Sequence, residues 1–274
     1  MFAALVMGEY MANTARASRE STLQSLQSVL RVRKLDRTLT TALPPLERRD
    51  ASAVVPVDVT AIDECLHGGV PRGHLSEIAG ASSSGRTTLL LHVMAAATRR
   101  GEIVALVDTL DRLDVASAAS AGIDLDRMLW IRPPSPPPSV RLPSARPPSA
   151  GAEAIERALK ALNLVLQAGG FGVVAIDLAD VPASTLKQIP FTTWMRVQRV
   201  IEGSDTACLL LSSEPLARSA GGLTLAMTGT TTWAGESSRS RRLAGLDARV
   251  RVMSPRRRFD GQADVRALAN DGRR

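Results

Sequence analysis

The 274-residue chain predicts an α/β fold, with a mainly parallel sheet flanked by helices and closed on one side by an antiparallel edge. Short apolar stretches typical of buried strands alternate with helical segments of 12–18 residues, which is the pattern of βαβ units. Hydrophobic residues make up 45% and charged residues 22% of the chain, as in ordinary globular domains. The two cysteines, Cys65 and Cys208, exclude a disulfide scaffold and a cysteine-based zinc site.

The N-terminal part predicts a disordered segment over 1–12, followed by a helix and a linker over 13–56. Leu23, Leu26 and Leu30 lie on one face of the expected helix, and two prolines at 44 and 45 end it. An apolar stripe outside the sheet is typical of protein contact. The helix therefore binds another subunit or a partner, or, as the alternative, packs on its own domain.

We expect the core over residues 57–258 and a C-terminal tail over residues 259–274. The expected strands are 75–79, 103–107, 128–131, 172–176 and 206–211, with the antiparallel edge at 223–228 and 248–253. The expected helices are 61–66, 87–99, 115–121, 153–167 and 185–202. Residues 132–150 form an insertion, because eight prolines lie between 132 and 148 and proline suits neither a helix nor a central strand. We expect a solvated loop there.

The segment Gly80–Thr88, GASSSGRTT, has the glycine spacing of a phosphate-binding loop and lies between an expected strand and an expected helix. Its glycines permit unusual dihedral angles, and the amides at the helix N-terminus point at an anion. The pattern predicts a nucleotide site for ATP with magnesium, in which Thr87 is a metal ligand. The candidate nucleotide-binding residues of the loop are Gly80, Ser84, Gly85, Arg86, Thr87 and Thr88.

Arg86 occupies the position at which such loops carry lysine. Guanidinium is bulkier and planar, so it can fill the pocket that the terminal phosphate needs. Three interpretations stay open: a loop kept as architecture, a weak nucleotide site, and a chance glycine-serine loop. The strand that ends in Asp177 supplies the second expected magnesium ligand, because a carboxylate at the carboxyl end of a parallel strand lies near the phosphate loop.

These residues resemble the RecA ATPase core over roughly residues 57–258. Ala61–Thr88 resembles its opening, and it is the most specific part. Phe171–Asp177 is similar to the Walker B strand, and Ile103–Asp114 resembles the strand with the acidic loop. The resemblance makes Asp114 the aspartate on the adenine side. It also places Leu110 where the family has a catalytic glutamate and Ser213 near its phosphate sensor, so no catalytic residue is assigned.

Without the lysine, the base and the sensor, and with an added helix, the chain resembles the ImuA family of RecA-like accessory proteins. That resemblance implies a role in DNA-damage-induced translesion synthesis, with an ImuB-like Y-family polymerase-like protein and an error-prone DnaE-type polymerase as partners, and with weak or no ATP hydrolysis. An active RecA-type DNA-dependent ATPase is the alternative. A regulator that caps a RecA filament through the N-terminal helix is compatible with the accessory role.

Arginine supplies nearly all of the 34 basic residues, because lysine occurs only at Lys34, Lys160 and Lys187. Residues 239–258 concentrate arginine against a single acid, Asp247, which predicts a phosphate-binding patch for DNA, with a solvated basic tail as the alternative. The candidate DNA-binding residues are Arg239, Arg241, Arg242, Arg249, Arg251, Arg256, Arg257 and Arg258. No apolar run is long enough for a membrane span, and we expect a cytoplasmic protein.

Overall fold

The computed structural model describes residues 53–134, 149–217, 222–235, 240–254 and 261–268. Their centre is an eight-stranded sheet in the order β10-β9-β8-β3-β7-β6-β4-β5. From β8 to β5 neighbouring strands run parallel, whereas β8, β9 and β10 pair antiparallel. The predicted α/β class, with its parallel sheet and antiparallel edge, is therefore confirmed.

The strands of the parallel part are β3 (Leu75–Gly80), β4 (Val104–Asp108), β5 (Met128–Ile131), β6 (Val173–Asp177) and β7 (Ala207–Ser212). The strands of the edge are β8 (Thr224–Ala234), β9 (Arg242–Ser254) and β10 (Gln262–Leu268). A separate pair joins β1 (Val54–Val55) to β2 (Val70–Pro71).

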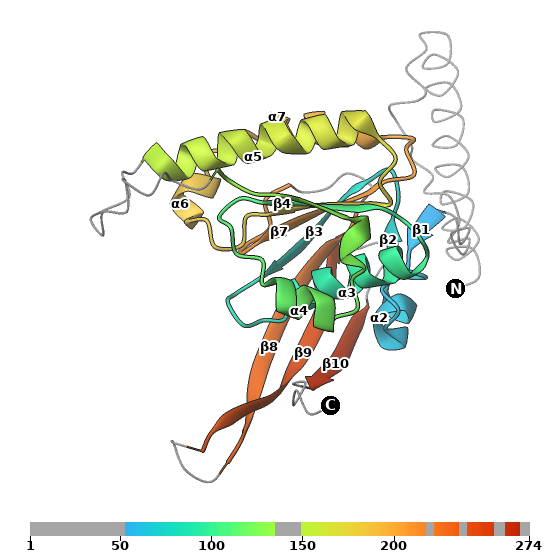
Figure 1. Ribbon diagram of the computed structural model, residues 1–274, viewed down its shortest axis with the longest axis vertical. Coiled ribbons are helices and arrows are strands. Elements are labelled where there is room, and N and C mark those ends of the chain that lie inside the picture. The colour runs from blue at the N-terminus through green and yellow to red at the C-terminus, as the bar shows by residue number, and fades with distance from the viewer. Residues whose placement is uncertain (1–52, 135–148, 218–221, 236–239, 255–260, 269–274) are drawn as a thin grey trace, which may run out of the picture. The chain divides into compact units, whose positions relative to one another are not determined.

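Helices cover both faces of the parallel strands, as Figure 1 shows. One face packs on α2 (Thr60–Cys65) and α3 (Arg86–Arg99), through side chains such as Ile78 and Leu209. The other packs on α5 (Ser149–Ala168) and α7 (Phe191–Ile201), through side chains such as Val174 and Leu210. Two short helices, α4 (Val115–Ser120) and α6 (Ala183–Leu186), follow β4 and β6. Alternation of side chains along each strand thus feeds two apolar clusters.

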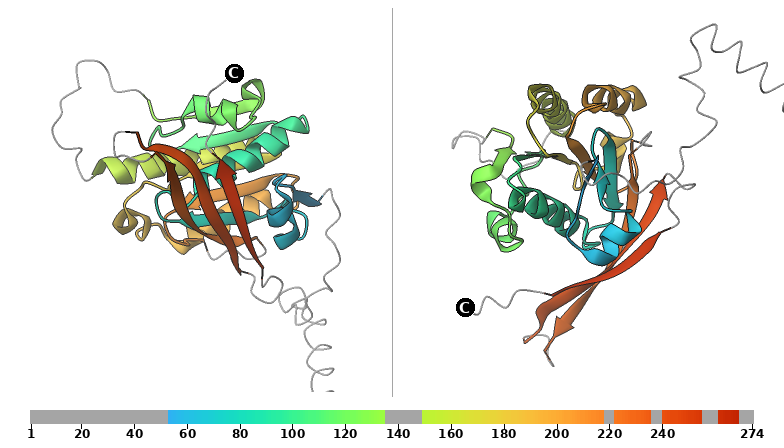
Figure 2. Two further views of the ribbon diagram at one scale, coloured as in Figure 1. Left: turned by 90° about the horizontal axis from the view of Figure 1, so that it is seen from below. Right: turned by 90° about the vertical axis from the view of Figure 1, so that its right-hand side faces the viewer.

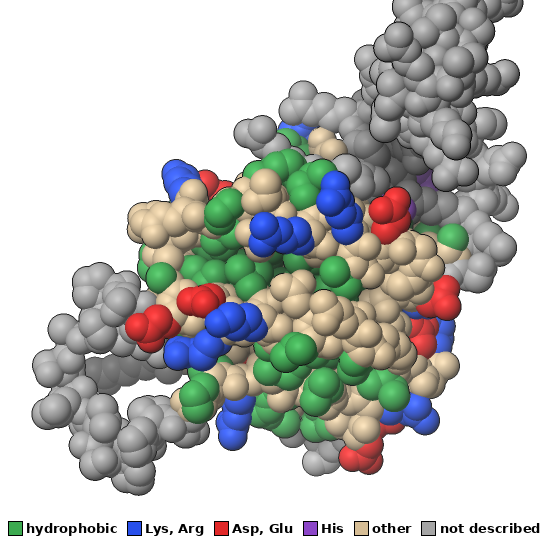
Figure 3. Space-filling view, turned by 90° about the horizontal axis from the view of Figure 1, so that it is seen from above, with side chains coloured by type: hydrophobic (Ala, Val, Ile, Leu, Met, Phe, Trp, Pro, Cys, Tyr) green, Lys and Arg blue, Asp and Glu red, His purple; other side chains and the backbone are tan. Residues whose placement is uncertain are grey.

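The outer side of the α5–α7 layer mixes hydrophobic and charged side chains (Figure 3). Leu164 of α5 is 68% exposed, and Phe191 and Met195 of α7 are 47% and 40% exposed. None of the helices described is both long and apolar enough to cross a membrane.

The structure corrects several expected boundaries. The expected helix over 185–202 is two helices, because Pro190, which lacks an amide hydrogen, stands at the N-cap of α7. Residues 54 and 55, expected in a linker, form strand β1, and α5 begins at residue 149, inside the expected insertion. The expected helix and disordered segment before residue 53 lie outside the described residues, as do 135–148 of the insertion.

The expected tail over 259–274 contains a strand. β10 pairs with β9 from Gln262 to Leu268, so the sheet extends past the predicted end of the core at 258. Its core face is made by Ala263 and Val265, which join the cluster around α2 and α3. The sequence feature that could have indicated β10 is the alternation of polar and small apolar residues in QADVRAL, which is a strand pattern of period two.

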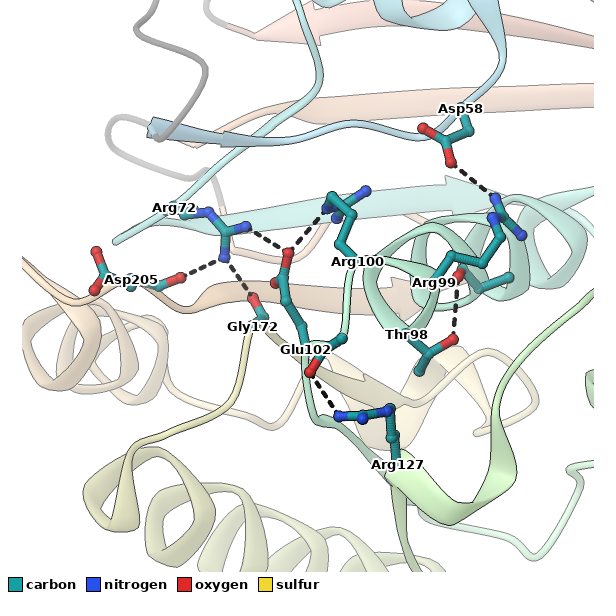
Figure 4. Close-up of polar contacts among 11 residues, drawn as sticks. Asp58, Arg72, Thr98, Arg99, Arg100, Glu102, Arg127, Gly172 and Asp205 are labelled. Atoms are coloured by element: carbon teal, nitrogen blue, oxygen red, sulfur yellow. Dashed lines mark hydrogen bonds and ion pairs between the residues drawn. The ribbon is translucent and has the colours of Figure 1, made fainter.

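Arg72 joins the amino ends of four neighbouring parallel strands, as Figure 4 shows. Its guanidinium donates to the carbonyl oxygens of Asp205 (2.7 Å) and Gly172 (3.4 Å) and to Glu102 Oε1 (2.9 Å). Arg100 Nε donates to the same carboxylate oxygen at 2.9 Å. Since these residues precede β3, β7, β6 and β4, the network closes one end of the sheet and leaves the carboxyl ends free for a site.

β8 and β9 are the longest strands, with 11 and 13 residues, and they run beyond the helices (Figures 1 and 2). Their pairing continues to Trp233 opposite Leu243 and Ala234 opposite Arg242, with an irregularity between Thr232 and Trp233 that skips Ala244. We call residues 230–234 and 240–246 the ribbon. The predicted basic tail is therefore in large part a paired strand of the sheet.

Candidate functional site

The phosphate loop has the predicted strand-loop-helix geometry. β3 ends at Gly80 and α3 begins at Arg86, with Gly85 in the left-handed region at φ 90°. A Cβ on Gly80 would lie 2.4 Å from Ser84 Oγ and 2.7 Å from the carbonyl oxygen of Met227, so only glycine fits. No side chain caps α3, and the first intrahelical bond runs from Leu89 N to Gly85 O. The first-turn amides can therefore face an anion.

The loop is packed against the antiparallel edge. A Cβ on Gly229 of β8 would lie 3.0 Å from the carbonyl oxygen of Ser83, and one on Gly85 would lie 3.0 Å from Leu246 Cδ2. A cavity of about 460 Å³ opens above the loop. Thr87 and Thr88 line it from α3, and Leu243, Leu246 and Leu268 line it from β9 and β10. The edge strands thus form one wall of the candidate nucleotide site.

Arg86 is turned into the loop. Its Nη1 donates to the carbonyl oxygen of Gly80, and its Nη2 lies 3.0 Å from Asp180 Oδ1. The side chain is only 8% exposed, whereas Asp180 is 49% exposed and also lies 3.8 Å from Arg112 Nε. The guanidinium therefore braces the two ends of the loop. Asp180 was missed from the sequence because it follows β6 in an irregular turn without any motif.

Asp177 and Asp108 lie in register at the carboxyl ends of β6 and β4. Burial raises the pKa of Asp177, and the charges of Asp108 and Asp180 raise it further, against the amide of Ala179 and the charge of Arg86. Ala179 N donates to Asp177 Oδ1 at 2.8 Å. The carboxylate is thus in an environment that disfavours its charge, as a site for a cation would be, and Thr87 is on the same edge.

The loop after β4 is built around Asp108. Its carboxylate accepts from the amides of Arg112 and Leu113 at 2.8–2.9 Å and from Trp130 Nε1 at 3.2 Å. Leu110, at the position of the catalytic glutamate, packs against the cluster around α5 and α7. Asp114 caps α4 by accepting from Ser117 N at 3.0 Å, and the hydroxyl of Ser117 lowers the pKa of Asp114. Asp114 thus has a structural partner within its own helix.

The segment after β7, where the phosphate sensor would lie, is hydrogen-bonded to the neighbouring strand β3. The fully buried carboxylate of Glu77 on β3 accepts from Leu216 N at 3.3 Å and from Ala217 N. Ser212 Oγ donates to the carbonyl oxygen of Glu214 at 2.7 Å. Glu77 was not a sequence candidate, because a single glutamate inside an apolar strand carries no spacing signal.

The candidate DNA-binding arginines divide into different environments. Arg249 forms two bonds with Asp264, the shorter at 2.6 Å from Nε, and Arg266 pairs with Asp247 in the same way across β9 and β10. Arg241, Arg242 and Arg251 are exposed, without a carboxylate partner among the described residues. Arg239, Arg256, Arg257 and Arg258 lie outside the described residues. The pairing with β10 therefore offsets part of the charge that the sequence concentrates here.

The residues described hold no cluster of three or more His, Cys, Asp or Glu side chains suited to a metal. The loop amides fit a phosphate group. The side chains leave a site for a magnesium-bound triphosphate incomplete, because the Arg86 guanidinium is hydrogen-bonded to Gly80 and Asp180 inside the loop.

Comparison with known proteins points to the same superfamily. Residues 43–139 match the RecA N-terminal domain. Protein RecA of Prochlorococcus marinus (strain MIT 9303) is 34% identical over 137 residues, which are 45% of this chain and 36% of that protein. Protein RecA of Clavibacter michiganensis subsp. michiganensis (strain NCPPB 382) is 34% identical over 132 residues, or 48% of this chain and 31% of that protein.

A longer match is to Protein RecA of Heliobacterium modesticaldum (strain ATCC 51547 / Ice1), which is 27% identical over 174 residues, 58% of this chain and 45% of that protein. The chain thus spans between about a third and just under a half of the length of these relatives. The fold, the phosphate loop and these matches together support a place for this chain in the RecA-like superfamily.

Proposed function

We propose that this chain is a RecA-like accessory protein of DNA-damage-induced translesion synthesis, the process called SOS mutagenesis. It acts in the cytoplasm by binding partner proteins and DNA, and it hydrolyses ATP weakly or not at all. Its partners are an ImuB-like Y-family polymerase-like protein and an error-prone DnaE-type polymerase, with RecA as a further candidate. The N-terminal segment 13–42 is the proposed protein-contact element.

The observation that carries this proposal is the state of Arg86. A lysine in this position would extend toward the terminal phosphates as a point charge. Arg86 instead bonds to Gly80 and Asp180, and Leu110 packs into an apolar cluster where a base would be needed. A phosphate loop whose Arg86 side chain is hydrogen-bonded inside the loop supports the proposal of a binding protein that keeps the fold of an ATPase. ATP with magnesium is then a weak ligand at most.

The experiment measures ATP hydrolysis and partner binding on the same preparation. We expect hydrolysis no faster than that of Asp177→Ala, with or without DNA, together with retention of the polymerase-like partner in a pull-down. Replacing Leu23, Leu26 and Leu30 with aspartate should abolish that retention. Arg86→Lys should tighten binding of an ATP analogue, because it frees the loop and restores the point charge.

A DNA-stimulated, magnesium-dependent turnover that disappears in Asp177→Ala would establish the alternative, an active RecA-type ATPase of recombination and repair. The intact backbone of the loop and the placement of Asp177 favour that alternative. Absence of partner retention, with the fold intact by circular dichroism, would overturn the accessory role itself.

A further inference from the structure

The ribbon carries the core face of the sheet out into solvent. Met227 of β8 is buried in the core, and Thr231 and Trp233 follow it at even spacing on the same face. The skipped residue in β9 brings Leu243 onto the face of Leu246, opposite Trp233. Trp233 is 52% exposed and Leu243 46% exposed. An aromatic and an aliphatic side chain are thus both partly exposed on this face, and Leu243 also lines the cavity above the loop beside Thr87 of α3.

The ring of Trp233 is held in place by two neighbours. Its Nε1 donates to Thr231 Oγ1 at 3.2 Å, and the guanidinium carbon of Arg241 lies 5.8 Å from the ring centroid. The first contact fixes the orientation of the indole, and the second is a cation–π interaction. Because Trp233 is 52% exposed although Arg241 lies over its ring, a substantial part of the side chain stays accessible to a flat ligand.

The charges around this ring are free for an anion. Arg249 and Arg266, in the body of the edge, each bond to an aspartate. Arg241 and Arg242, beside Trp233, have no such partner within the part of the chain that the structure describes. Exposed cations next to an oriented aromatic ring are the combination with which proteins hold single-stranded nucleic acid: bases stack on the ring, and phosphates meet the cations.

We infer that the ribbon binds an unpaired nucleic-acid strand, with one base stacked on Trp233 and the adjoining phosphates on Arg241 and Arg242. The inference rests on the DNA contact in the proposed function and specifies the form of the DNA. In a duplex the bases stack on one another and hide their faces, so only an unpaired strand can use the ring. Stacking is tolerant of sequence, since every base has a π face.

The experiment titrates the full chain with a fluorescent thymidine oligonucleotide and with a duplex of equal length. Trp233→Leu should weaken binding of the single strand by about tenfold, the scale of one lost base stack. It should leave the duplex affinity and the salt slope unchanged, because no phosphate contact is removed. Trp233→Phe should retain most of the affinity. Arg241→Ala and Arg242→Ala should each flatten the single-strand salt slope by about 0.7.

Phe191→Leu is the matched control, because it removes a half-exposed aromatic ring from α7, on the helix layer, and should change nothing. Quenching of tryptophan emission by the oligonucleotide should disappear in Trp233→Phe. Equal single-strand affinities of Trp233→Leu and wild type would overturn the stacking while leaving DNA contact intact. If wild type binds neither DNA at low salt, both the stacking and the DNA contact of the proposed function fail. If Trp233→Leu loses only the polymerase-like partner, the ribbon is a protein-docking surface, and the inference is overturned.

Discussion

At the scale of single residues, the site is defined by the partners of its charged side chains. Arg86 stabilises the phosphate loop through Gly80 and Asp180, while Asp177 stays in surroundings that oppose its charge. A buried carboxylate with a raised pKa costs stability at neutral pH, because folding must hold it ionised away from water. Such a cost is typical of residues kept for binding rather than for the fold.

Asp177→Asn should therefore stabilise the protein at neutral pH. The amide oxygen of asparagine can still accept from Ala179 N, and the charge is gone. The folded-state pKa of Asp177 lies above 3.8, so the stability that the protonated carboxyl contributes is fully present below pH 3.8. That stability is lost as the pH rises through the folded-state pKa. The gain should be about 1.4 kcal/mol for each unit of the pKa shift, measured by urea unfolding.

The gain should vanish when unfolding is measured at a pH below 3.8, where both the folded and the unfolded wild type carry a protonated Asp177. A destabilised Asp177→Asn at neutral pH would mean that favourable contacts outweigh the burial of the charge.

At the scale of elements, the sequence was most informative where burial is complete. β4 and β6 are apolar up to a final aspartate, since both of their faces pack on helices, and their positions could be predicted within a residue or two. β10 could not, because its inward residues are two alanines and a valine between exposed polar residues. The pairing of Arg249 with Asp264 could not be predicted either, because it depends on the register of β9 and β10 and joins residues 15 apart in the chain.

The core face of β10 can be tested with one charge. Ala263→Asp places a carboxylate against the α2–α3 cluster, where Ala263 is 5% exposed, and should lower the free energy of unfolding by about 3 kcal/mol. Gln262→Asp introduces the same charge one residue earlier, on the exposed side opposite Arg251, and should change little. Urea unfolding monitored by circular dichroism compares the two. Equal stabilities would show that β10 is not part of the cooperative unit.

At the scale of the whole fold, the two ends of the parallel sheet have opposite character. The amino ends are closed by Arg72 and Glu102, whereas the carboxyl ends hold the phosphate loop, Asp108 and Asp177. Burial by itself would raise the pKa of Glu102, and the bonds from Arg72 and Arg100 more than offset it, so the pKa is lowered. The network therefore contributes stability in its ionised form.

Glu102→Gln should destabilise the protein at neutral pH by about 1.5–3 kcal/mol, the range for hydrogen bonds to charged groups. The extra stability of the wild type is fully present above pH 4.5, the ordinary pKa of a glutamate. It is lost as the pH falls through the lower folded-state pKa of Glu102. Thermal melting at neutral and acid pH checks this. Asp58→Asn, which breaks the exposed pair with Arg99, is the control and should show little change at either pH.

The phosphate loop packs on the edge strands so tightly that a Cβ on Gly229 would lie 3.0 Å from the carbonyl oxygen of Ser83, and one on Gly85 would lie 3.0 Å from Leu246 Cδ2 at the base of the ribbon. Because the loop and the edge strands pack without room for a side chain between them, a nucleic-acid strand bound by the ribbon and a phosphate bound by the loop should be thermodynamically linked. Whatever factor the first ligand imposes on the affinity for the second, the second must impose on the first. Even without ATP hydrolysis, phosphate binding at the loop would then change the affinity of the ribbon for nucleic acid.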